Sequence, residues 1–456
     1  MSLRSFRDPS GWLEDDGERI VRHLAPEARP EVEALLASSL YARLVEQGDL
    51  IPGSWTGPDQ LGHPRIALPT YAFEWTPAML ADAARLTLRI QRQAWAEGWS
   101  LKDASAHNVL FDGSRPRLCD LLSLQRRQPD DAPGWTAYGQ FVRHFIVPLL
   151  ACDVLGRQPR DIFLAHRDGL RASEVAALVP WYRHFGLDLL LHVRLPARWE
   201  RRRIAEAAPS PSAPKSQTAR GDGTPWLLKS LERLVDRLSA PQQPSQAWSN
   251  YVANRDHYSD EQLDRKRAYV SALVATRRFA RALDIGANSG EFTRLLAPSC
   301  DQVVALDEDM QALDALYRSA AHDTAGRATL CIHANMARPT PPTGWRLRES
   351  HALQARFEGR FDLVIALAVI HHLVVTERLP VAQWFEVLGS WCRGLLLVEF
   401  VARDDPRFQE VAGRNQGLYE GWNLEAFLHA AAPWFTPVEQ HAINPHRQLV
   451  LFQRRP

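Results

Sequence analysis

A glycine-rich turn and an acid that follows it are the strongest chemical signals in this sequence. The turn reads LDIGANSG, spans Leu283–Gly290 and ends a short apolar run. Glycine at 286 lets the backbone approach a ligand without a Cβ clash, and glycine at 290 allows a helix to pack closely on a strand. The carboxylate of Asp284 can accept hydrogen bonds from a ligand ammonium group or from the amides of the turn. Asp307 follows Gly290 by 17 residues, at the end of the next apolar run.

The spacing within this turn favours one kind of ligand. In an open parallel sheet, ligands bind beyond the carboxyl ends of the strands, where Asp307 can accept hydrogen bonds from both hydroxyls of a ribose. Dinucleotide-binding enzymes carry G-x-G-x-x-G. The spacing here is G-x-N-x-G, preceded by an acid. This favours a ligand with an amino acid head over one with a pyrophosphate. The alternative is a generic glycine turn in an α/β protein.

LDIGANSG resembles the turn of class I S-adenosylmethionine-dependent methyltransferases. The resemblance implies that Asp284, Gly286 and Gly290 line the methionine part of S-adenosyl-L-methionine, and that Asp307 binds its ribose. Asn288 stands where the family more often has glycine. The further cofactor positions that the resemblance implies are Glu308, then Asp309 and Met310 beside the adenine, and Asn335 against the adenine amino group.

Three residues further along the chain are candidates for catalysis. His371 and His372 follow FDLVIALAVI, at a strand end where the substrate should lie. Histidine can take a proton near neutral pH, which suits deprotonation of a hydroxyl or amine. Methyl transfer is an in-line displacement in which positioning supplies much of the rate, so a base is not required. The alternative is that both histidines cap a helix or satisfy buried polar groups. Glu399, after LLLV, can orient a histidine, contact the substrate or serve as a structural acceptor.

A second pattern lies in the N-terminal half. LKDASAHNVLF contains Asp103 and Asn108, and Asp120 follows Asn108 by 12 residues. This resembles the catalytic loop and metal aspartate of protein kinases and aminoglycoside phosphotransferases, where the first Asp orients the acceptor hydroxyl and the other two residues hold magnesium. However, no lysine precedes Lys102, no glycine-rich loop occurs in the first 75 residues, and Leu-Leu follows Asp120. An active phosphotransferase, a degenerate kinase-like binding module and a chance match all stay open.

A narrower resemblance covers most of the chain. The segments PTPPTGWRLRES, IHHL and LLLVEFVARDDP, together with SLKDASAHNVLF in the N-terminal half, are similar to uncharacterised methyltransferases described as related to nodulation proteins. This resemblance brings no established substrate. By association it suggests a glycan acceptor, beside small molecules in general.

Composition excludes several other classes. The 456 residues include 54 Lys+Arg and 53 Asp+Glu, a net charge of +1, which gives no electrostatic reason to expect nucleic acid as a partner. The five cysteines form no C-x-x-C pair, so neither a structural zinc site nor a disulfide framework is expected, and no metal is assigned. No apolar run is long enough to span a membrane. We therefore expect a cytoplasmic protein; nothing in the sequence sets its oligomeric state.

Segment 206–224 divides the chain, because its Pro, Ala, Ser and Gly residues cannot bury enough surface to order it. It predicts two domains, at 1–205 and at 225–456. For the first of them, the resemblance of the segment with Asp103, Asn108 and Asp120 implies a kinase-like α+β fold. In the second domain, strands alternate with helices, which predicts a doubly wound, Rossmann-like α/β fold. Aromatic residues at 248–258, and Lys266 after them, precede its first strand. The aromatic rings can pack on the cofactor sulfonium by cation–π contact or in the core.

The sequence thus supports three hypotheses. The first is a methyltransferase whose N-terminal domain recognises a substrate or partner. The second is a bifunctional phosphotransferase–methyltransferase, and the third is a non-catalytic scaffold that senses the cofactor.

Overall fold

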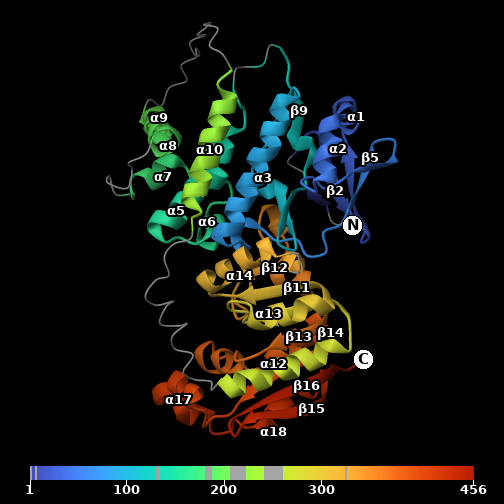
Figure 1. The fold of residues 1–456 in the computed structure, drawn as a ribbon, viewed down its shortest axis with the longest axis vertical. Helices are drawn as coiled ribbons and strands as arrows, with labels where there is room; N and C mark the ends of the chain where they lie inside the picture. Colours follow the sequence, from blue (N-terminus) through green and yellow to red (C-terminus); the bar gives the residue numbers. More distant parts are fainter. Residues whose placement is uncertain are drawn as a thin grey trace. The chain divides into compact units, whose positions relative to one another are not determined.

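The computed structural model describes residues 3–5, 8–129, 131, 134–179, 187–205, 222–240, 260–323 and 326–456. The chain divides into two compact units, Met1–Phe111 with Pro116–Gln242, and Asp112–Arg115 with Gln243–Pro456 (Figure 1). Most of the expected linker, 206–221, and the aromatic segment at 248–258 lie outside the described residues. Within the described ranges, no helix has both the length and the apolar character that crossing a membrane requires.

As far as it is described, the second unit is built on a seven-stranded sheet of order β12-β11-β10-β13-β14-β16-β15. The first five of these strands run parallel, whereas β16 pairs antiparallel with both β14 and β15. The strands are β10 (Phe279–Ile285), β11 (Cys300–Asp307), β12 (Thr329–His333), β13 (Phe361–Ala366), β14 (Cys392–Val401), β15 (Phe435–Asn444) and β16 (Arg447–Arg454). The order reverses between β10 and β13, and in open α/β sheets ligands bind at the carboxyl ends of the strands beside such a reversal. The predicted α/β class is confirmed.

Helices connect the parallel strands, as the alternating pattern predicted. Several begin at side-chain caps: Asp309 accepts backbone hydrogen bonds at the start of α14, and Asn423 does so at α18. The helices of this unit are α12 (Asp260–Ala275), α13 (Glu291–Leu296), α14 (Met310–His322), α15 (Leu353–Phe357), α16 (Val381–Trp391), α17 (Pro406–Ala412) and α18 (Leu424–Ala431). Shorter turns are η9 (Ala297–Ser299), η10 (Gly326–Ala328), η11 (Trp345–Leu347), the π-helical η12 (His372–Thr376) and η13 (Gly413–Tyr419).

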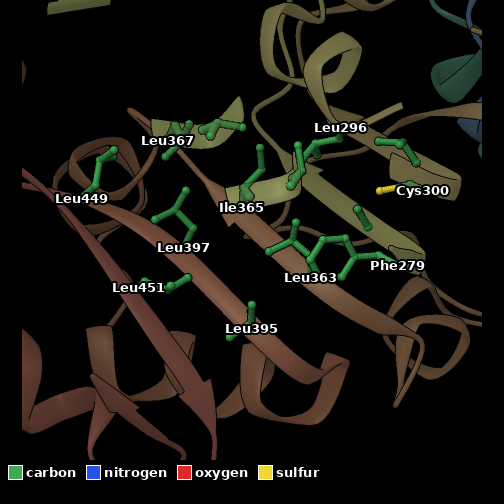
Figure 2. Close-up of a cluster of buried hydrophobic side chains, with 14 of the residues drawn as sticks. Phe279, Leu296, Cys300, Leu363, Ile365, Leu367, Leu395, Leu397, Leu449 and Leu451 are labelled. Atoms are coloured by element: carbon green, nitrogen blue, oxygen red, sulfur yellow. The ribbon is translucent and has the colours of Figure 1, made fainter. Parts of the chain in front are cut away.

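One face of this sheet carries a continuous apolar core (Figure 2). Because side chains alternate along a strand, every second residue faces the same side. Leu363 and Ile365 of β13 therefore lie beside Leu395 and Leu397 of β14 in this layer. The cluster also includes Val270 and Val274 of α12, Leu296 of α13, and Leu449 and Leu451 of β16. This apolar layer packs the central strands of the sheet together and so fixes the positions of their carboxyl ends.

The first unit contains a five-stranded antiparallel sheet among its described residues, of order β1-β2-β3-β5-β4. Its strands are β1 (Leu3–Ser5), β2 (Gly11–Asp15), β3 (Arg19–Leu24), β4 (Ser54–Gly57) and β5 (Gln60–Pro64). Two small sheets follow, one of β6 (Trp99–Leu101) with β9 (Leu124–Arg126), the other of β7 (Val109–Asp112) with β8 (Arg115–Leu118). These strands flank the segment that carries Asp103, Asn108 and Asp120.

The helices of the first unit differ in two places from the sequence expectation. The amphipathic pattern of Glu174–Leu191 predicts one helix, but α7 ends at Ala176. The amphipathic helix α10 (Thr224–Leu238) belongs to this unit, where it packs on α3 (Pro77–Ala96), although the sequence division at 225 placed it in the second half. The other helices are α1 (Arg29–Leu36), α2 (Ser39–Glu46), α4 (Tyr138–Phe141), α5 (Val147–Leu155), α6 (Pro159–Ala165), α7 (Ala172–Ala176), α8 (Leu187–Leu189) and α9 (Leu195–Ala205). Short turns are η1 (Pro26–Ala28), η2 (Ala72–Glu74), η3 (Ala106–Asn108), η4 (Leu121–Ser123), and the π-helical η5 (Val142–Ile146) and η7 (Leu190–Arg194).

Apolar burial and ion pairs explain the position of α10. Its buried face includes Leu228, Leu231, Leu234 and Val235. Two ion pairs join it to α3, Arg85 with Asp236 at 2.9 Å and Arg92 with Glu232 at 2.9 Å. The segment 206–224, which the sequence predicted as the boundary between two domains, is therefore followed by a helix that still belongs to the first unit.

Candidate active site

The turn after β10 has a left-handed backbone at three positions. The φ angles of Gly286, Asn288 and Gly290 are 72°, 49° and 82°. A Cβ on Gly286 would lie 2.4 Å from Cγ2 of Val369, and one on Gly290 would lie 2.2 Å from Cδ1 of Leu316. Both glycines are thus required for space as well as for φ. The expected close packing at Gly290 is confirmed, and the neighbour that imposes it is α14.

Asp307, the last residue of β11, holds this turn. Its Oδ2 accepts the N–H of Asn288 at 2.6 Å, and its Oδ1 accepts the N–H of Asp309 at 2.7 Å. Burial raises the pKa of Asp307 to about 6, although both backbone hydrogen bonds oppose this shift. Each carboxylate oxygen keeps acceptor capacity for one further donor, because a carboxylate offers about four acceptor positions. The group therefore fits a vicinal diol.

Asp284 lies one strand away and is buried, with 2% of its surface exposed. The hydroxyl of Thr293, on α13, donates to its Oδ2 at 2.6 Å. Burial raises the pKa of Asp284 to about 7, and the charge of Asp307 adds to the increase. A carboxyl group in this state is readily ionised by a cationic neighbour, so it fits a ligand ammonium group.

Glu308 and Asn335 come together at the ends of β11 and β12. The side-chain amide of Asn335 donates to carboxylate oxygens of Glu308 and of Glu377, the latter at 3.0 Å. Its oxygen accepts the backbone N–H of Ala337 at 2.7 Å. Arg338 pairs with Glu377 at 2.8 Å. Both predicted residues are therefore adjacent, and Asn335 would exchange one of these partners on contacting a ligand.

Asp309 and Met310 follow at the start of α14. The Asp309 carboxylate accepts the N–H groups of Gln311 and Ala312 at 2.9 and 3.0 Å. Met310 is buried, with 9% of its surface exposed. In the structure, Asp309 serves as a helix cap.

The two histidines differ in environment. His371 is 2% exposed, and its Nδ1 atom has no hydrogen-bond partner among the described residues. Burial lowers the pKa of His371 to about 3, and His372 and Arg407 lower it further through their charge. His372 is more exposed than His371, and the centroids of the two rings lie 4.2 Å apart. Partial burial of the His372 ring lowers its pKa as well. His371 is therefore neutral near pH 7 and can accept a hydrogen bond.

Glu399 is fully buried and does not contact either histidine in the described hydrogen bonds. Its Oε2 accepts from Nζ of Lys266 at 2.7 Å and from the N–H of Ala368 at 2.9 Å. Nη1 of Arg447 lies 3.5 Å from its Oε1, and Arg447 also pairs with Asp405. Of this group, sequence reasoning noted Lys266 for a different role and missed Arg447. The D-D-P sequence before α17 marks Asp405 as a helix cap and was a usable signal.

In the first unit, Asn108 and Asp120 are linked through Ser123. The Asn108 amide donates to Oγ of Ser123 at 2.9 Å, and that hydroxyl donates to Oδ2 of Asp120 at 3.0 Å. Arg22, on β3, pairs with the other Asp120 oxygen at 2.8 Å. Asp103 lies outside this series of hydrogen bonds, and its carboxylate accepts the N–H of Ser105 at 3.0 Å. A cation from the protein thus already neutralises Asp120, which favours a structural role over metal binding.

No cluster of three or more His, Cys, Asp or Glu side chains suited to a metal ion occurs in the described part of the chain.

Comparisons with known proteins give one full-length relative. No protein-family model matches the chain. The nodulation protein NoeA of Rhizobium meliloti (strain 1021) is 28% identical over 466 residues, covering 99% of this chain and 95% of that protein.

Similar solved structures cover about half of the chain. N-methyltransferase NodS from Bradyrhizobium japonicum WM9, in complex with S-adenosyl-L-homocysteine, is 13% identical, covers 45% of this chain and 98% of that chain, and has a TM-score of 0.31. The bifunctional kinase–methyltransferase WbdD is 16% identical, with 43% of this chain and 40% of that chain covered and a TM-score of 0.30.

The second unit has a Rossmann-like α/β fold. Its parallel strands, with β10 at the centre of the sheet, agree with the doubly wound arrangement that the alternating sequence pattern predicted. The kinase-like character of the first unit stays a prediction.

Proposed function

We propose that this chain is a methyltransferase that binds S-adenosyl-L-methionine at the carboxyl ends of β10, β11 and β12. The observation that carries the proposal is a pair of acids on neighbouring strands: Asp307 holds the glycine turn through Asn288, and Asp284 is buried on β10 beside it. Bound S-adenosylmethionine would supply a methyl group on a sulfonium, which a nucleophile can displace in line.

Each acid has a separate task in this proposal. Asp307 accepts the two ribose hydroxyls on the oxygens that already accept one backbone N–H each. Asp284 faces the ammonium group of the methionine part, and the positive charge of that group offsets the cost of ionising a buried carboxyl group. Gly286 keeps the backbone between them free of a side chain. Glu308 and Asn335 form the polar border on the adenine side.

His371 is proposed to orient the methyl acceptor. Its Nδ1 is buried and lacks a partner among the described residues, so it can accept a hydrogen bond from an acceptor hydroxyl or amine. Because burial lowers its pKa to about 3, the imidazole is neutral near pH 7 and its unprotonated nitrogen can orient the acceptor. His372, which is exposed beside it, is a second candidate contact. Both residues would act by positioning the nucleophile in line with the methyl group.

The acceptor is proposed to be a small molecule or a glycan. The net charge of +1 provides no general attraction to nucleic acid. Similarity to a nodulation protein along the whole chain is consistent with a glycan, and the first unit then supplies recognition of the substrate or a partner. The pairing of Asp120 with Arg22 argues against phosphotransfer, which would need Asp120 to hold magnesium.

Isothermal titration of the full chain with S-adenosyl-L-homocysteine tests the cofactor assignment. Wild-type protein should bind, and Asp307→Ala should weaken binding about 10- to 100-fold, the usual effect of losing hydrogen bonds to a charged group. Asp301→Ala is the matched control, because it removes an exposed carboxylate at the other end of β11. No binding by wild type at millimolar ligand, or equal binding by Asp307→Ala, would refute the assignment.

Methyl transfer itself needs a separate measurement. Cell extract incubated with labelled S-adenosylmethionine and the protein should yield a labelled product that mass spectrometry can identify. His371→Ala should reduce its formation while leaving S-adenosylhomocysteine affinity within about threefold. Cofactor binding with no labelled product in any extract would support the non-catalytic scaffold instead.

A further inference from the structure

Four buried charged residues form a network at the carboxyl end of the core face. Lys266 donates to Glu399 at 2.7 Å, Arg447 lies 3.5 Å from Glu399, and Arg447 pairs with Asp405 at 2.6 Å. The side chains of all four residues are at most 3% exposed. The two cations and two carboxylates give the group no net charge, which offsets part of the cost of burying them.

The network continues the apolar layer of the sheet. Glu399 follows Leu395 and Leu397 at every second position of β14, so it faces the same side as the core. It pairs in register with Leu449 of β16, another member of that core, and Arg447 lies two residues before Leu449. Lys266 approaches from α12, the helix that covers this face. Burial of a charge here therefore requires a specific reason, because apolar residues would pack at least as well.

The second bond of Glu399 supplies that reason. Its Oε2 also accepts the backbone N–H of Ala368 at 2.9 Å. Ala368 has a φ of 56°, a left-handed conformation that is unfavourable for a residue with a Cβ. Such a conformation persists only where the surroundings enforce it, and it is concentrated at functional sites.

The turn at Ala368 connects the network to the proposed cofactor and acceptor sites. Val369 comes next, and its Cγ2 occupies the space against Gly286 that a Cβ there would need. His371 follows two residues later, buried and with its Nδ1 unbonded to any described residue. The path of the chain from β13 to His371 is thus set at Ala368.

We propose that Glu399 is a positioning residue: by holding the strained Ala368 turn, it fixes Val369 against the glycine turn and places His371 for the acceptor. Lys266 and Arg447 contact the Glu399 carboxylate and hold it in the orientation that this bond requires. The function served by the turn rests on the proposed methyltransferase activity, whereas the bond from Glu399 to Ala368 can be tested without it.

Hydrogen–deuterium exchange of the full chain measures the turn directly. Glu399→Asp, whose side chain is one methylene too short to reach Ala368, should speed exchange of the amides in 367–373 at least tenfold. The milder Glu399→Gln, whose amide oxygen can still accept the N–H of Ala368, should have a smaller effect in the same segment. Asp405→Asn is the matched control, since it breaks the same network without touching Ala368. It should lower overall stability but change exchange in 367–373 less than threefold.

Affinity for S-adenosyl-L-homocysteine provides the second measurement. Glu399→Asp should weaken binding about tenfold, and adding Ala368→Gly should recover part of the loss, because glycine adopts a φ of 56° without strain. Unchanged exchange in both Glu399 variants, or an equal increase in Asp405→Asn, would overturn the proposal. If wild type fails to bind the ligand, the proposed function fails, while the exchange result still decides the role of Glu399.

Discussion

The backbone N–H of Asn288 donates to the carboxylate of Asp307 over 2.6 Å, which joins the glycine turn after β10 to the acid at the end of β11. The same carboxylate group thus shapes the turn and, in the proposed function, accepts the ribose. This bond forms with Asn288 in a left-handed conformation, at a φ of 49°. Asparagine and glycine tolerate this region, whereas β-branched residues do not.

The effect of a substitution at Asn288 on ligand affinity should therefore depend on whether the new residue adopts a left-handed conformation, and not on its polarity. Asn288→Gly should leave the affinity for S-adenosyl-L-homocysteine within about threefold of wild type, because glycine takes the same φ. Asn288→Val should weaken it at least tenfold, since the valine would move the N–H that bonds to Asp307. Isothermal titration of the two variants measures the difference. Equal affinities would show that the conformation at 288 is unimportant for binding.

Gly290 should be among the positions most sensitive to a methyl group. Its φ of 82° and a Cβ position 2.2 Å from Leu316 predict that Gly290→Ala costs about 2–4 kcal/mol in free energy of unfolding. Gly359→Ala is the control, because Gly359 has a φ of 61° but open space around its Cβ position, and should cost about 1 kcal/mol. Chemical denaturation of the full chain measures both changes.

A double substitution separates the two causes at Gly290. Leu316→Ala removes the clashing side chain and by itself should cost about 2–5 kcal/mol. In the double variant, the loss of free energy of unfolding should be clearly less than the sum of the two single losses. The reason is that Leu316→Ala removes the side chain that the new Cβ of Gly290→Ala would contact. Strict additivity would mean that backbone strain alone makes the glycine necessary.

The sequence predicted those parts of the site that depend on local spacing. Asp284, Gly286 and Asp307 are set by a strand, a tight turn and the next strand, so their positions follow from periodicity and turn chemistry. The helix caps at Asp309 and Asp405 also have local signals. These features are established within about 30 residues of chain.

Long-range pairing could not be predicted in the same way. The contacts of Glu399 join α12, β14, β16 and the turn after β13, and no sequence spacing connects Lys266 with Glu399, which are 133 residues apart. The pair of Arg22 and Asp120 likewise joins two residues that are far apart in the sequence. The position of α10 also depends on tertiary packing, because an amphipathic helix beside a linker can cover either neighbouring domain.

The two buried carboxyl groups predict an unusual dependence of stability on pH. The usual pKa of Asp is about 3.9, whereas burial raises the pKa of Asp307 to about 6 and that of Asp284 to about 7. The folded state therefore binds protons more strongly than the unfolded chain, and stability should fall as the pH rises from about 4 to about 7. Each carboxyl contributes at most about 1.4 kcal/mol per pH unit. Denaturation of wild type and Asp284→Asn at several pH values should show a shallower fall in the variant.

Ligand binding should have the opposite dependence on pH. A ligand ammonium group favours the ionised form of Asp284, so affinity for S-adenosyl-L-homocysteine should rise as the pH increases through about 7. The rise should disappear in Asp284→Asn and persist in Asp301→Asn, which changes an exposed carboxylate. An affinity that falls over this range in wild type would contradict the role of Asp284.

The Arg22–Asp120 pair makes a prediction for the first unit. The two side chains are 4% and 18% exposed, so Asp120→Ala leaves a buried guanidinium without its carboxylate partner. Breaking a buried ion pair from one side typically costs about 3–5 kcal/mol. Asp103→Asn should cost less than about 1 kcal/mol, because the amide oxygen can still accept the N–H of Ser105. Thermal unfolding of the full chain measures both.

The same variants distinguish this structural role from phosphotransfer. Because Asp120 pairs with Arg22, magnesium with ATP should not raise the melting temperature of the wild-type protein. Arg22→Met should destabilise the first unit as Asp120→Ala does. A phosphotransferase would behave differently. Its melting temperature would rise with ATP only when magnesium is present, and Asp103→Asn would abolish phosphoryl transfer while leaving that rise intact. Magnesium-dependent stabilisation that Asp120→Asn removes would therefore establish a metal role for Asp120 in spite of its pairing with Arg22.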